Sequence, residues 1–149
     1  MKMKNTIIVL LLLFLAGCGK VIHYAPGSTV NNTSQAKEII KQIIQEQPGE
    51  LAPIKVEVTD KYIKMYKIKS NQLDGYNIPW NQLVYFNNIG KVDIRQKRHE
   101  SKKWFVVSVM DKKKSLKCTV YTAKENRVKA FIDALHTMQT TMVSQSSIQ

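Results

Sequence analysis

Hydrophobic residues recur with three different spacings along this chain, and each spacing predicts a different kind of segment. Residues 7–16 (IIVLLLLFLA) form one apolar run without a charge. Between positions 34 and 46, apolar residues recur every three or four positions, as on one face of an α-helix. Beyond residue 54, apolar and polar side chains alternate, which is typical of half-buried β-strands.

The first predicted helix spans residues 34–46. Ser34 or a neighbour is expected to cap it, and Pro48-Gly49 ends it. Its apolar positions are Ala36, Ile39, Ile40, Ile43 and Ile44. We expect this face to pack on the domain's own core, although a partner or a membrane surface would fit the same face.

The second predicted helix follows the alternating region. Its start, Thr122-Ala123-Lys124-Glu125, has the pattern of a capping box, in which the threonine and glutamate side chains bond the first backbone N–H groups. A methionine-containing apolar stripe runs from Val128 to Met142. Core packing is the simpler interpretation of this stripe, and a promiscuous binding groove is the alternative. The polar residues 144–149 are expected to form a frayed tail.

Seven short antiparallel strands are predicted between the helices, at residues 54–58, 62–68, 78–80, 83–86, 91–95, 104–110 and 116–121. Turns are expected at Thr59-Asp60-Lys61 and at residues 111–114. The alternation places Cys118 on the buried side of its strand, as a small apolar residue. The prediction is therefore one α+β domain over residues 34–143, with an open barrel or sandwich that the C-terminal helix closes.

The N-terminal apolar run is about ten residues long, whereas a spanning helix needs roughly 20. Lys2 and Lys4 precede it, so the segment has the organisation of a secretory signal. Its end, Leu15-Ala16-Gly17-Cys18, resembles the lipobox of bacterial lipoproteins. The resemblance implies that the Cys18 thiol first receives a diacylglyceryl group. Signal peptidase II then recognises Leu15, Ala16 and Gly17 and removes residues 1–17, and the new amino group of Cys18 takes an acyl chain such as palmitate.

In such lipoproteins, an aspartate after the lipidated cysteine commonly marks retention in the inner membrane. Gly19 stands at that position here. The resemblance thus implies the periplasmic face of the outer membrane or, in a cell without one, the outer face of the cytoplasmic membrane. Residues 18–33 are rich in Gly, Pro, Ser, Asn and Thr, and are expected to form a flexible tether.

The mature domain resembles bacterial pleckstrin-homology-like (PH-like) domains over residues 50–142. The resemblance is carried by Ile78-Pro79-Trp80 with Leu83, the strand 104–110, the turn 112–115 and the helix 124–138 (KENRVKAFIDALHTM). Members that bind phosphoinositides use a basic first hairpin loop. Here that turn, Thr59-Asp60-Lys61, carries a single lysine, which argues against phosphoinositide binding. Most other members bind proteins or have no known ligand.

The formal net charge of the chain is +12. Most of this charge comes from residues 76–149, which contain 13 basic and 5 acidic side chains. Asp93, Asp111 and Glu125 lie among lysines and are expected to form ion pairs. The basic residues form two clusters, expected at opposite ends of a hairpin: Arg95, Lys97, Arg98, Lys102 and Lys103, and then Lys112, Lys113, Lys114 and Lys117. They fit a solvated surface, anionic headgroups or envelope polysaccharide, or an acidic protein partner.

Catalysis and metal binding find little support in the sequence. His23, His99 and His136 lie in different predicted elements, without Cys or carboxylate at metal-ligand spacing, and there is no glycine-rich phosphate loop. No cofactor is expected, and no nucleic-acid motif accompanies the charge. We therefore expect a non-catalytic, membrane-anchored lipoprotein of the cell envelope that binds or assembles proteins. The alternative is direct binding of anionic lipid or polysaccharide through the basic second half.

Overall fold

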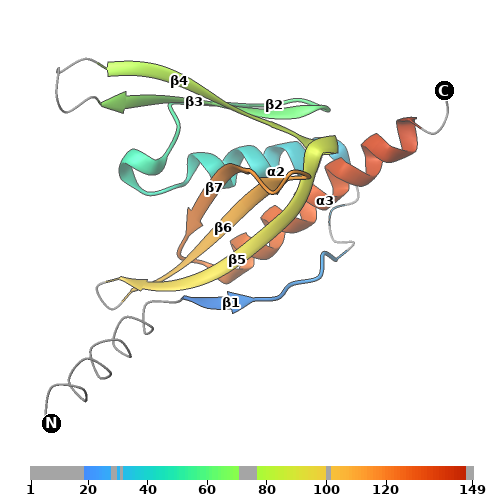
Figure 1. The fold of residues 1–149 in the computed structure, drawn as a ribbon. Coiled ribbons are helices and arrows are strands. Elements are labelled where there is room, and N and C mark those ends of the chain that lie inside the picture. The colour runs from blue at the N-terminus through green and yellow to red at the C-terminus, as the bar shows by residue number, and fades with distance from the viewer. Residues whose placement is uncertain (1–18, 28–29, 31, 71–76, 100–101, 147–149) are drawn as a thin grey trace, which may run out of the picture.

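The computed structural model describes residues 19–27, 30, 32–70, 77–99 and 102–146. This part contains two α-helices and seven strands. The strands form two antiparallel sheets, with strand orders β1-β5-β6-β7 and β2-β3-β4 (Figure 1). In chain order, the elements are β1 (Lys20–Ile22), α2 (Thr33–Gln45), β2 (Lys55–Val58), β3 (Tyr62–Ser70), β4 (Asn77–Tyr85), β5 (Ile89–His99), β6 (Lys102–Asp111), β7 (Leu116–Thr122) and α3 (Glu125–Ser146). This confirms the predicted α+β class, and the two sheets are not closed into a barrel.

The core lies where α2 and α3 pack against each other and against the inner faces of both sheets. Alternate residues of β6, Phe105, Val107 and Val109, point into it, as the period of two predicts. Phe131 and Leu135 of α3 meet them from the helix side. Since apolar burial is the main driving force for folding, this single cluster holds both sheets and both helices together.

The isoleucine face of α2 is part of that core. Ala36, Ile40, Ile43 and Ile44 are buried, which confirms core packing rather than a free surface. The helix begins one residue earlier than predicted because Asn32 caps it, with its side-chain oxygen accepting the Gln35 N–H at 2.7 Å.

The hairpin between β2 and β3 turns at residues 59–61 as predicted. The Thr59 hydroxyl accepts the Lys61 and Tyr62 N–H groups and fixes the turn. The prediction of separate strands at residues 78–80 and 83–86 is wrong, because β4 runs without a break beside β3. Pro79 interrupts nothing since β4 is the edge strand of its sheet, where a missing N–H costs no inner ladder bond.

Strand β5 is longer than the predicted 91–95 and begins with an irregularity at Gly90. A Cβ on Gly90 would lie 2.7 Å from the Asp111 carbonyl oxygen and from the Lys112 Cα. Only glycine therefore lets the start of β5 approach the end of β6 this closely.

The predicted capping box is wrong. Helix α3 begins at Glu125, and the carbonyl of Lys124 accepts the first helical N–H groups, from Arg127 and Val128. Thr122 still ends β7, where its hydroxyl accepts the Lys124 N–H at 3.3 Å. The helix begins two residues too late for Thr122 to act as its N-cap, and Glu125 pairs with Lys129 instead.

The predicted tether is structured in its first part, so that prediction is wrong for residues 20–22. These residues form β1, which pairs with Ile94–Gln96 of β5. Farther along, the Tyr24 hydroxyl donates to the buried Asp133 carboxylate of α3 at 2.9 Å, and the Gly27 N–H donates to the same group at 2.8 Å. Short strand pairing and these hydrogen bonds hold the segment against the domain.

Candidate functional site

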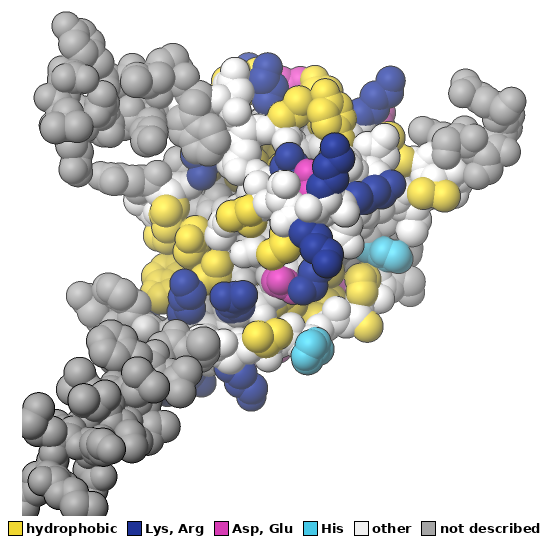
Figure 2. All heavy atoms as spheres, in the orientation of Figure 1, with side chains coloured by type: hydrophobic (Ala, Val, Ile, Leu, Met, Phe, Trp, Pro, Cys, Tyr) yellow, Lys and Arg dark blue, Asp and Glu magenta, His cyan; other side chains and the backbone are white. Residues whose placement is uncertain are grey.

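The predicted basic residues occupy the two ends of β6, as expected from the sequence. The hairpin cluster (Arg95, Lys97, Arg98, Lys102 and Lys103) lies where β5 turns into β6, and the turn cluster (Lys112, Lys113, Lys114 and Lys117) lies where β6 turns into β7. Because β6 has ten residues, the two ends are about 30 Å apart. Lys and Arg side chains are correspondingly spread over the face in Figure 2, with other side chains between them. The structure does not bring the two clusters into one site.

All five members of the hairpin cluster are exposed. In the described part of the chain, no acidic side chain forms an ion pair with any of them. Glu100, between the two strands in sequence, lies outside the described residues. The hairpin cluster is therefore a group of solvated positive charges at one end of the four-stranded sheet.

The turn cluster is partly structural. The buried Asp111 carboxylate accepts the Lys113 and Ser115 N–H groups at 2.9 and 2.8 Å, and it pairs with the Lys117 ammonium at 3.1 Å. The Ser115 hydrogen bond above all lowers the pKa of Asp111, against the effect of burial, and Lys117 adds to the lowering. Lys117 is thus neutralised, and only Lys112, Lys113 and Lys114 remain as exposed charges.

The other predicted ion pairs are also present. Asp93 pairs with Lys91 at 2.9 Å, and Glu125 pairs with Lys129 at 3.0 Å. These carboxylates neutralise neighbouring lysines on the surface, as the sequence predicts.

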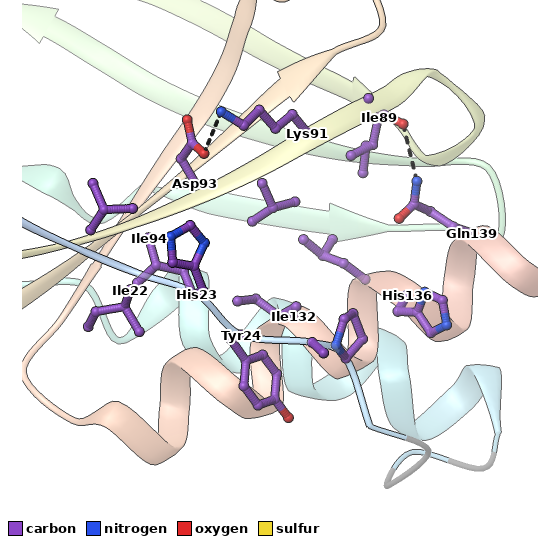
Figure 3. Close-up of a pocket in the computed structure, with 16 residues that line it drawn as sticks. Ile22, His23, Tyr24, Ile89, Lys91, Asp93, Ile94, Ile132, His136 and Gln139 are labelled. Carbon is purple, nitrogen blue, oxygen red and sulfur yellow. Dashed lines mark hydrogen bonds and ion pairs between the residues drawn. The ribbon is translucent and has the colours of Figure 1, made fainter.

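A groove of about 740 Å³ lies between β5, α3 and the segment 21–26. Figure 3 shows Ile22, His23 and Tyr24 on one side, β5 with Lys91 and Asp93 above, and α3 with Ile132 and His136 on the other side. Gln139 of α3 donates to the Ile89 carbonyl at 3.2 Å and crosses one end of it. We refer to this hollow as the β5–α3 groove.

The β5–α3 groove has an apolar floor and a polar rim. Ile94, Ile132 and Leu135 line the floor and are buried, while His23, Lys91 and His136 are exposed at the rim. The groove exists because β1 pairs with β5 only as far as Ile94 and then turns away toward Asp133. Residues 91–93 of β5 are paired with β6 on one side. Among the described strands, none covers their other side, which borders the groove.

The rim does not assemble a recognisable metal or catalytic centre. In the described ranges, no three His, Cys, Asp or Glu side chains gather as metal ligands would. Asp93, the carboxylate in the groove, is engaged with Lys91. What the groove offers chemically is an open strand edge above an apolar floor, which suits an extended peptide.

Sequence reasoning missed this groove because its first wall lies in the predicted tether. The only local signal is a short run with β-prone Val21, Ile22 and Tyr24, which is too brief to mark a strand without its distant partner. The remaining predicted residues, Leu15, Ala16, Gly17 and Cys18, lie outside the described residues.

In the described part of the chain, neither helix has the length and apolarity needed to cross a membrane. No protein-family model, curated protein or solved structure shows significant similarity to this chain.

Proposed function

We propose that this protein is a lipid-anchored lipoprotein of the bacterial cell envelope and that it binds an extended segment of a partner protein in the β5–α3 groove. The protein acts without catalysis, as a binding or assembly module. One observation carries the binding part: residues 91–93 of β5 have a strand neighbour on one side only, and their other side borders an apolar groove.

An added strand would hydrogen-bond to the backbone groups of this edge in the same way that β1 pairs with the neighbouring residues of β5. β1 already lies antiparallel beside β5 at Ile94–Gln96, so the neighbouring stretch of the same edge has the geometry to take an extended chain. Such strand addition gives affinity through main-chain hydrogen bonds, and the side chains at alternate positions give specificity. Alternate residues of the bound segment would contact Val92 and Ile132, so we expect them to be apolar.

The charge of the domain favours a partner that is acidic around this segment. The chain carries a net charge of +12, and at the rim Asp93 and Lys91 neutralise each other, which leaves the charge of the rest of the domain to attract an acidic partner. Opposite charge on the partner would raise the association rate and orient the encounter.

Site-specific photo-crosslinking tests the groove. A benzoylphenylalanine at His136, which is exposed on α3 at the rim, should give a crosslink to one partner in cells. The same residue placed at Asn126, exposed on α3 outside the groove, is the matched control. A peptide copied from the crosslinked segment should then slow hydrogen exchange at the amides of residues 91–93. Equal crosslinks from both positions, or unchanged exchange, would contradict the proposal.

Cell fractionation tests the anchor separately. The Cys18→Ser chain, exported behind a signal sequence whose removal does not depend on this cysteine, should move from the membrane fraction to the soluble fraction, because two or more acyl chains hold a protein firmly and none remains in this variant. The intact mass of the wild-type protein should begin at Cys18 and include the lipid. A Cys18→Ser chain that still floats with membranes would argue against this mode of anchoring.

A further inference from the structure

We propose that the hairpin cluster and the neighbouring Trp104 rest on the anionic headgroups of the membrane that carries the anchor, which fixes the orientation of the domain. This inference rests on the proposed lipid anchor at Cys18. It adds that the domain stands on one defined end instead of swinging on a tether.

The chain enters the described domain directly beside the hairpin cluster. A Cβ on Gly19 would lie 2.6 Å from the Gln96 carbonyl oxygen, and the Lys97 side chain is at 3.3 Å. Figure 1 shows β1 starting beside the end of the four-stranded sheet where β5 turns into β6. Consecutive Cα atoms are about 3.8 Å apart, so the Cα of Cys18 lies within one such step of Gly19. A lipid on Cys18 therefore brings the bilayer surface to this end.

No long flexible linker within the described residues separates the proposed anchor from the domain. β1 pairs with β5 from Lys20 onward, and the contacts of Tyr24 and Gly27 with Asp133 hold the next residues. A tether that was free over residues 18–33 would span roughly 20 Å and would allow any orientation. With β1 in place, the attachment point is next to Gln96 and Lys97.

The charges of this end fit a headgroup surface. The last residue of β5, His99, is only a few positions beyond Gln96, so the hairpin cluster lies within about 10 Å of the attachment point. That distance is close to the Debye length at physiological salt, so an anionic membrane surface at the attachment point would attract the positive charges of the cluster. The turn cluster, about 30 Å away along β6, is screened from the same surface.

An apolar hollow lies within the same end. Trp104, which pairs with Lys97 across β5 and β6, lines a hollow of about 360 Å³ with Leu51, Val106 and Tyr121. Leu51 is 40% exposed. Aromatic side chains beside basic ones are typical of surfaces that lie at the membrane–water interface. The end nearest the anchor thus combines free positive charge with exposed apolar surface.

This orientation holds the β5–α3 groove away from the bilayer. Residues 91–93 lie five or more positions along β5 from Arg98, a separation of roughly 15–25 Å. The open strand edge would face the periplasm, where a partner segment can reach it without displacing the membrane contact.

Tryptophan quenching tests the orientation. The lipidated protein with Trp80→Phe keeps Trp104 as its single tryptophan and is reconstituted into phosphatidylcholine vesicles with or without phosphatidylglycerol. A phospholipid with a spin-labelled headgroup quenches tryptophans that touch the surface. We expect strong quenching of Trp104 with phosphatidylglycerol, weaker quenching without it, and a decline between about 0.1 M and 1 M NaCl as the Debye length shrinks.

Two charge-reversal variants separate the contact from general electrostatics. Lys97→Glu with Lys102→Glu and Lys103→Glu should remove the phosphatidylglycerol-dependent quenching. Lys112→Glu with Lys113→Glu and Lys114→Glu changes the net charge equally at the far end and should leave the quenching unchanged. Equal quenching in both kinds of vesicle, or equal loss in both variants, overturns the orientation.

Failure of the anchor gives a different result from failure of the orientation. If the Cys18→Ser chain stays with cell membranes, the proposed anchor is wrong and the orientation that rests on it falls as well. If that chain is released but Trp104 of the lipidated protein is not quenched, the anchor stands and the hairpin contact alone is wrong.

Discussion

At the scale of single residues, two buried side chains show what the sequence can and cannot predict. The alternation of apolar residues along its strand predicts that Cys118 faces the core, and the side chain is 1% exposed. The surrounding lysines predict an ion pair for Asp111, which Lys117 confirms. The larger role of Asp111 is to hold the N–H groups of the tight turn where Lys114 has a φ of 64°, and this role is visible only in the folded turn.

The buried Cys118 thiol is expected to be inert in the folded protein. Burial raises its pKa to about 12, so almost no thiolate exists near neutral pH, and the thiolate is the reactive form. A thiol reagent at pH 8 should leave Cys118 unmodified until denaturant is added. In denaturant, the mature wild-type protein should show one titratable thiol if Cys18 is lipidated, and two if it is not.

The Asp111 carboxylate should contribute pH-dependent stability. Its folded-state pKa is lowered, so the stabilisation is present above the unfolded-state pKa of about 3.9 and is lost as the pH falls through the folded-state value. Urea unfolding should show Asp111→Asn to be less stable than wild type at pH 6. The difference should shrink as the pH falls toward 2. A difference that is constant with pH would mean that the charge of Asp111 is not involved.

At the scale of elements, the sequence predicts those helices and strands whose formation depends on residues close together in the chain. The helices and the two hairpins with short turns appear where the sequence places them, since their signals lie within a few residues. β1 has no such signal, because its three residues gain a strand partner more than 70 positions away, at Ile94–Gln96. Asn81 and Gln82 interrupt the apolar pattern of β4, whereas the long partner β3 holds it in one piece. The β5–α3 groove is walled by the N-terminal segment, so it too depends on distant contacts that the local pattern does not predict.

The hydroxyl of Tyr24 should be needed to keep the N-terminal segment on α3. It donates to Asp133, and burial and this carboxylate raise the pKa of Tyr24. Tyr24→Phe removes a hydrogen bond to a charged group, worth about 1.5–3 kcal/mol. Hydrogen exchange of residues 20–27 should accelerate. Tyr85→Phe is the matched control, because Tyr85 is 48% exposed and its hydroxyl makes no hydrogen bond within the described residues. This control variant should leave the hydrogen exchange of residues 20–27 unchanged.

At the scale of the whole molecule, two sheets share one core through the helices that pack against both. Phe131 of α3 is fully buried in it. The sequence predicts this core well. The alternation of apolar residues along β6 and their recurrence every three or four positions along α3 identify the residues that point inward. It does not predict how the sheets meet, because the contact of Gln82 in β4 with the Lys117 carbonyl in β7 involves polar groups without a periodic signal.

Loss of the Phe131 ring should weaken the whole domain together. Phe131→Ala is expected to lower the free energy of unfolding by about 3–5 kcal/mol, as other large cavities in protein cores do. Val143→Ala, also on α3 but 64% exposed, should change it by less than about 0.5 kcal/mol. Urea denaturation followed by circular dichroism and by tryptophan fluorescence should show coincident transitions, because one core serves both sheets.

The pairing of β1 with β5 also decides how a mechanical load would enter the domain. The N-terminal end of β1 points toward the β5–β6 turn, so a pull from that side acts along the strand axis. The three residue pairs then resist in shear, sharing the force instead of peeling apart one after another. The hydrogen bonds that the Tyr24 hydroxyl and the Gly27 N–H donate to Asp133 would take up the load next and pass it to α3. A pull applied at the N-terminal end of β1 would thus first be borne at one edge of the four-stranded sheet.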